Sequence, residues 1–255
     1  ARDSIAKNNG LSKMSAMEYY LHIADGYYKS KFSIMRFSGT DRRWFWDSEA
    51  DTKIQGEAIP NFSHNERTAE QLCYRALEIS QNNLSAWSLL NCVFLAEYLE
   101  GKMALQTAKA KKEEVPQEID QFAASTAKLR NLVRGTGPEK LYATLARAVM
   151  DKRIGVAVEA ANALGHTETA AGFEKALAAG PAKVLVASLA HADNRLRYSA
   201  AHALVRINPK KDFAGSDKVV KNLESALGIS AQRIILVVSE NQDFLNSLQF
   251  NITKT

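Results

Sequence analysis

The sequence predicts an all-α fold, an α-solenoid assembled from successive helical hairpins. Glycine and proline are scarce, with 13 and 5 residues among 255, whereas an all-β fold needs many tight turns. Alanine is abundant and runs of β-branched residues are short, which favours helix. Apolar residues also recur at helical spacing, and part of this pattern repeats about 40 positions later.

The first helix is predicted to begin at Ser15, because Ser15-Ala-Met-Glu18 has the pattern of a capping box. Three sets of residues at helical spacing follow: Tyr20, Ile23, Ala24 and Tyr27; Ala69, Cys73 and Ala76; Trp87, Leu90, Asn91 and Phe94. Their spacing resembles that of tetratricopeptide (TPR) repeats. The resemblance departs at Gln81, where that family usually has proline, and at Asn91, where glycine or alanine is common.

A long insertion separates the first two of these helices. Tyr20 and Trp87 lie about twice the usual ~34-residue TPR period apart, and the excess falls at residues 32–64, predicted as a partly ordered loop. Its basic and aromatic residues are candidate partner-binding residues: Arg42, Arg43, Trp44 and Trp46. Interleaved in this way, they suit stacking on nucleic-acid bases or anchoring a protein. The alternative is that the tryptophans pack the insertion against the neighbouring helices.

Residues 102–114 are charged and rich in alanine, and are expected to form the solvated end of a helix. The segment from Gln117 to Arg134 is amphipathic and is predicted to be the helix that joins the two halves of the chain.

The 40-residue repeat lies in the C-terminal half. Leu145–Val149 aligns with Leu185–Leu189, and the alanines that follow each segment keep the same register. Gly137-Pro138 and Gly180-Pro181 are expected to open the first helix of each unit. An additional short helix is expected between the units, at residues 167–178. A third unit should begin with Ser216 as its N-cap and end at Gly228.

The segment Leu189–Ile207 resembles a HEAT repeat, with Leu196-Arg197 at the position of the family's Val-Arg pair. Asp193 keeps the second acid of the usual turn, whereas His191 replaces the first. The resemblance implies that Arg197 reaches an acidic turn on the neighbouring unit. It also implies that the second helix of each hairpin lines a concave surface.

Helical spacing leaves one set of polar residues facing solvent on these second helices. This candidate partner-binding groove comprises Glu159, Asn162, His166, His202 and Arg206. The alternative is an ordinary solvated helix face.

The end of the chain breaks the helical pattern. Arg233–Val238 is predicted to be a strand and Asp243–Phe250 a helix, which together resemble the beginning of a response-regulator receiver domain. The predicted organisation is therefore a TPR-like domain at 1–115, HEAT-like repeats at 116–228 and a truncated receiver-like segment at 229–255.

The motifs argue for a binding protein. No nucleophile motif, phosphate-binding loop or metal-ligand spacing occurs, so we expect no catalytic residue, metal or cofactor. Cys73 and Cys92 are expected to be core residues, with a disulfide as the alternative. We expect no membrane span, and a signal peptide that is absent or already removed. The expected function is a scaffold or adaptor whose partner is a protein or peptide.

Two alternatives stay open. The net charge is +5, and the whole excess of basic over acidic residues lies in the C-terminal half. This charge and the pI of about 9.1 suit nucleic-acid binding. Some proteins with HEAT-like repeats are DNA-repair glycosylases, and others are lyases that attach bilin pigments. The resemblance therefore leaves an enzyme such as a lyase as the other alternative.

Overall fold

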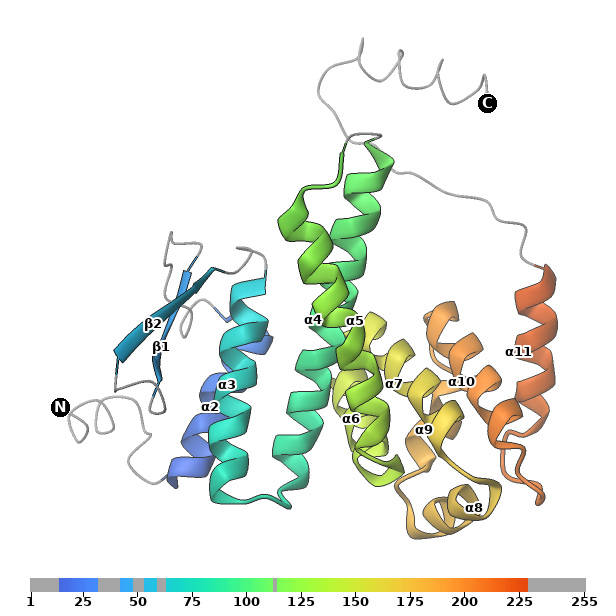
Figure 1. The fold of residues 1–255 in the computed structure, drawn as a ribbon. Helices are drawn as coiled ribbons and strands as arrows, with labels where there is room; N and C mark the ends of the chain where they lie inside the picture. Colours follow the sequence, from blue (N-terminus) through green and yellow to red (C-terminus); the bar gives the residue numbers. More distant parts are fainter. Residues whose placement is uncertain (1–13, 32–41, 48–52, 59–62, 112–113, 229–255) are drawn as a thin grey trace. The chain divides into compact units, whose positions relative to one another are not determined.

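The computed structural model describes residues 14–31, 42–47, 53–58, 63–111 and 114–228. Within these residues the chain forms ten helices and one two-stranded sheet (Figure 1). The predicted all-α class is confirmed. The predicted strand and helix near the C-terminus lie outside the described residues.

The chain divides into two compact units, Ala1–Leu223 and Glu224–Thr255. The segment predicted to be TPR-like (1–115) and the segment predicted to be HEAT-like, as far as Leu223, lie in the first unit, which has one continuous apolar core running from Ala24 to Ile207. Of the second unit, the structure describes only the end of the last helix.

Four helices form the N-terminal half: α2 Ala16–Tyr28, α3 His64–Ile79, α4 Leu84–Ala110 and α5 Gln117–Gly135. The predicted capping box starts α2, since the Ser15 amide donates to Glu18 Oε2 at 2.8 Å and the Glu18 amide donates to Ser15 Oγ at 3.3 Å. Helix α3 packs against both α2 and α4, and the long α4 runs beside α5 (Figure 1).

The insertion contains a β-hairpin that the prediction of a loop missed. Strand β1 Arg42–Asp47 pairs antiparallel with β2 Lys53–Ala58, and Trp44 lies opposite Gly56 in the register. The run Trp44-Phe45-Trp46 has high β propensity, which is the signal that was available in the sequence.

Six helices follow: α6 Pro138–Met150, α7 Ile154–Thr167, α8 Ala170–Ala179, α9 Lys183–Ser188, α10 Asn194–Ile207 and α11 Asp217–Gly228. Helices α7 and α10 each have 14 residues, and they begin at 154 and 194, so the 40-residue offset holds for these helices. Helix α7 packs against both α6 and α10.

The first helix of the second unit begins later than predicted. Gly180 is the C-cap of α8, with φ 111°. A turn through Pro181 and Ala182 then leads into α9 at Lys183. By contrast, Pro138 occupies the first turn of α6 as predicted.

Both cysteines are buried and free, so the disulfide alternative is wrong. Burial raises the pKa of each thiol to about 12, which keeps both cysteines as neutral core residues at physiological pH.

Candidate functional site

Helix α7 packs against both α10 and α5. The α7–α10 contact is unusually close at Gly165, where a Cβ atom would lie 2.8 Å from the Cα atom of Ala203. Glycine therefore lets the two backbones approach each other near the ends of both helices. This approach brings side chains that are 40 positions apart in the sequence within hydrogen-bonding reach.

Two of the predicted residues meet across this contact. Arg206 Nε donates to the backbone oxygen of Gly165 at 3.3 Å, and Arg206 Nη2 lies 3.1 Å from His166 Nδ1. Because a guanidinium group can only donate, His166 Nδ1 accepts and the ring is neutral. The proton of the imidazole is thus on Nε2, where it is available to a ligand.

A third predicted residue, Glu159, is covered by the neighbouring helix. It was expected to face solvent, but its side chain is 9% exposed because Arg130 of α5 lies over it, with Arg130 Nε 2.9 Å from Glu159 Oε2. The Arg130 guanidinium also lies 5.6 Å from the ring centre of Tyr98. Glu159 therefore fixes α5 to α7 and is already paired.

The neighbouring arginine on α5, Arg134, is half-buried and has no such partner. Its Nε is buried without a hydrogen bond, and among the described residues no carboxylate lies within ion-pairing distance of either Arg134 or Arg206. Burial lowers the pKa of Arg134, and the charges of Arg130 and Arg206 add to this effect against the opposing charge of Glu159. The arrangement therefore holds unneutralised positive charge.

We call this surface the cationic face, and its residues are Arg130, Arg134, Glu159, Asn162, His166, His202 and Arg206. Burial lowers the pKa of His166, and Arg134, Arg206, Arg130 and His202 lower it further. The face thus contains three guanidinium groups and one carboxylate. His202 is exposed one turn before Arg206, and Asn162 is half-buried on α7.

Sequence reasoning found the residues on α7 and α10 but missed Arg130 and Arg134. The two arginines are four positions apart, so they share one side of α5. The same i,i+4 spacing identified His202 and Arg206, but α5 was interpreted only as a joining helix.

Arg197 does not have the predicted role. Its guanidinium donates to the backbone oxygen of His191 at 3.4 Å and to Asn194 Oδ1. His191 belongs to the turn of its own hairpin, and Asn194 is the first residue of α10. The acidic residue of the neighbouring turn, Asp151, is instead paired with Lys29 at 2.9 Å and with Arg147 at 3.5 Å.

The second candidate set cannot be built into a site. The structure places Arg42, Arg43, Trp44 and Trp46 in β1, but their side chains lie outside the described residues. The two interpretations of this cluster, partner binding and packing of the insertion, therefore remain predictions.

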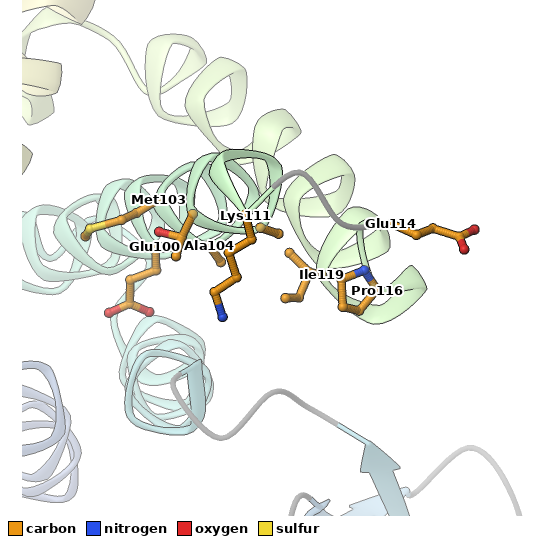
Figure 2. A pocket seen from close by; sticks show the side chains of 9 residues that line it. Glu100, Met103, Ala104, Lys111, Glu114, Pro116 and Ile119 are labelled. Atoms are coloured by element: carbon orange, nitrogen blue, oxygen red, sulfur yellow. The ribbon is translucent and has the colours of Figure 1, made fainter. Parts of the chain in front are cut away.

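A cavity of about 460 Å³ lies between the end of α4 and the start of α5 (Figure 2). Met103, Ala104 and Ile119 contribute apolar surface, whereas Lys111 and Glu100 contribute polar groups. Figure 2 shows the Glu114 carboxylate directed away from the other labelled side chains. Burial raises the pKa of Glu100 to about 8, with the charge of Glu66 adding to the rise.

The residues that the structure describes contain neither a metal-binding cluster nor a helix that could span a membrane. Across the described ranges, no group of three or more His, Cys, Asp or Glu residues is arranged to hold a metal ion. None of the helices that the structure describes is both long and apolar enough to cross a membrane.

Comparisons with protein families, with curated proteins and with solved structures found no match to this chain.

Proposed function

We propose that this protein is a non-catalytic interaction scaffold, built of TPR-like and HEAT-like hairpins, whose cationic face binds an acidic segment of a partner protein. The observation that carries the proposal is the convergence of Arg134, Arg206 and His166 from three helices without a carboxylate to neutralise the two arginines. Arginine is enriched among the residues that dominate protein interfaces, because its planar group forms paired hydrogen bonds with carboxylates.

The face is also held in place before a partner arrives. Arg130 is fixed by Glu159, and Arg206 is fixed by the backbone of Gly165. Fixed side chains lose less conformational entropy on binding, so more of the interaction energy contributes to affinity. These contacts favour binding of a defined segment over diffuse attraction to any anion.

Nucleic-acid binding is the second candidate, favoured by the same positive charge and by the pI of about 9.1. The described face offers three guanidinium groups, whereas a nucleic-acid surface normally follows many successive phosphates. We therefore place the acidic protein segment first.

Affinity capture with the Arg134→Glu/Arg206→Glu variant tests the proposal. Both substitutions reverse charge on the cationic face, so we expect a partner captured by the wild-type chain to be lost. The control is Arg75→Glu/Lys102→Glu, which changes the net charge equally at exposed positions of α3 and α4. Circular dichroism and melting temperature establish that each variant is folded.

Identical sets of captured proteins for the face variant and the wild type would refute the proposal. A parallel salt titration with DNA and RNA oligonucleotides decides between the two candidates. Steeply salt-dependent binding that the face variant abolishes, without loss of any protein partner, assigns the face to nucleic acid.

A further inference from the structure

An ion pair within the cationic face leaves fewer of its cationic groups available to a ligand. Glu159 is paired with Arg130, with 2.9 Å between Glu159 Oε2 and Arg130 Nε. Neither Arg134 nor Arg206 has a carboxylate within ion-pairing distance among the described residues. His166 adds one more donor, because its Nδ1 accepts from Arg206 and its Nε2 carries the proton.

We propose that Arg134, Arg206 and His166 form a seat for a phosphoryl group carried by a serine or threonine of the partner segment. This inference rests on the proposed function of the cationic face and specifies the chemistry of its ligand. The candidate groove predicted from the sequence did not include Arg134, because this residue belongs to α5, outside the repeated hairpins.

Charge matching favours a phosphoryl group over a carboxylate. A phosphoserine carries about −1.5 to −2 charges at pH 7 and has three acceptor oxygens, whereas a carboxylate carries one charge and two oxygens. Two unneutralised guanidinium groups therefore match one phosphoryl group. Arginine also binds phosphate through paired, charge-assisted hydrogen bonds.

The surroundings direct the ligand to this part of the face. The Glu159 carboxylate repels an anion from the side of Arg130, and it is already ion-paired with the Arg130 guanidinium. Arg206 is held against the Gly165 oxygen, so its position is set by the backbone of α7. Arg134 enters from α5 and is half-buried, which restricts its side chain. The seat is thereby defined by three different helices.

His166 provides a direct signal of occupancy. Its pKa is held low by burial and by the charges of Arg134, Arg206, Arg130 and His202, with Glu159 of its own helix also close to Arg134. A bound dianion cancels part of the positive field, so the pKa of His166 should rise on binding.

Imidazole resonances measured by NMR in the full chain test this signal with inorganic phosphate as the probe. We expect phosphate to shift the His166 and His202 resonances and to raise the pKa of His166, while His22 of α2 serves as the internal control. A His166 titration curve that does not change with phosphate would overturn the proposal.

Peptide affinity gives the second test. Three peptides of one sequence, Ala-Ala-X-Ala-Ala with blocked ends, carry phosphoserine, glutamate or serine at X. We expect the phosphoserine peptide to bind at least roughly tenfold more tightly than the glutamate peptide, and the serine peptide to bind most weakly. Arg134→Gln and Arg206→Gln should each remove this preference, whereas Arg75→Gln on α3 should keep it.

The outcomes separate this inference from the proposed function. Equal affinity for the glutamate and phosphoserine peptides would overturn the phosphoryl seat, while capture of the acidic partner would still support the scaffold. Tighter binding of an RNA oligonucleotide than of the phosphoserine peptide would also overturn it. If the partner is lost from the charge-reversal variant but phosphate leaves His166 unchanged, only the seat is refuted.

Discussion

Gly101 of α4 faces Thr126 of α5 so closely that a Cβ atom on Gly101 would lie 2.4 Å from Thr126 Oγ1 and 3.3 Å from the Cα atom of Ala123. Thr126 is fully buried, and its hydroxyl donates to the Phe122 backbone oxygen at 3.0 Å, so it cannot easily move. This contact sets how α5 lies on α4. Because α5 carries Arg130 and Arg134, it also affects the cationic face.

Gly101→Ala is therefore expected to destabilise the protein, although alanine is the better helix former. Overpacking a closely packed interface costs roughly 1–3 kcal/mol, which urea unfolding can measure. The control is Gly135→Ala at the end of α5, where an added Cβ atom meets nothing within 4 Å. Adding Thr126→Ala should restore part of the loss. A Gly101→Ala protein that is as stable as the Gly135→Ala protein would contradict this account.

The contact between Gly165 and Ala203 leads to a prediction about the face itself. Gly165→Ala must push α10 away from α7, because the nearest atom is the backbone Cα of Ala203 and cannot rotate aside. We expect a loss of roughly 1–3 kcal/mol and a longer distance from Arg206 to His166. The pKa of His166 should then rise towards its ordinary value, as observed by NMR. An unchanged His166 titration would show that Arg206 is positioned independently of this contact.

Patterns within single helices could be predicted from the sequence. The capping box at Ser15 and the buried face of α10, which includes Leu196, Ala200 and Leu204, follow from local spacing alone. The 40-residue offset similarly identified the register of α7 and α10.

Contacts between elements that are distant in the sequence could not be predicted in this way. Asn91 departs from the TPR pattern, and the structure gives a reason, because its Nδ2 donates to Thr136 Oγ1 at 3.0 Å and to Thr144 Oγ1 at 3.2 Å. The pairing of Arg130 with Glu159 likewise depends on how α5 crosses α7. No periodicity within one helix contains such information.

A charge network between α2 and the turn after α6 should make the fold sensitive to acid. Lys29 Nζ lies 2.8 Å from Asp25 Oδ1 and 2.9 Å from Asp151 Oδ1, and Arg147 also pairs with Asp25. Burial opposes ionisation of Asp25, but Lys29 and Arg147 together hold its pKa below the ordinary value. The stabilisation is therefore present above about pH 4 and is lost as pH falls through the lower, folded-state pKa.

Asp25→Asn tests this network. We expect the variant to be roughly 1–3 kcal/mol less stable than the wild type at pH 7, because two cations lose their shared carboxylate. The difference should shrink as pH falls through the folded-state pKa of Asp25, where the wild-type residue is also neutral. Urea unfolding at pH 7 and pH 3 measures both values, with the exposed Glu78→Gln as the control. A difference that is the same at both pH values would show that the loss is not electrostatic.

Glu97 on α4 should produce the opposite dependence at higher pH. Its side chain is fully buried, and neither carboxylate oxygen has a hydrogen-bond partner among the described residues. Burial raises its pKa to about 8, and the charges of Glu70, Glu66 and Glu100 add to the rise, whereas Arg67, 3.4 Å away, opposes it. The folded state thus keeps a proton that the unfolded state releases above its ordinary pKa. Stability should therefore fall as pH rises from about 5 to about 8.

Glu97→Gln replaces the protonated acid with a neutral group of similar shape. We expect the variant to be roughly 1–2 kcal/mol more stable than the wild type at pH 8 and nearly equal to it at pH 5. Urea unfolding at the two pH values measures the difference, and Glu78→Gln again serves as the exposed control because its carboxylate is 60% exposed on α3. If Glu97→Gln destabilises the protein equally at both pH values, the ion pair with Arg67 outweighs the cost of burying the charge. In that case Glu97 is ionised in the folded state at neutral pH.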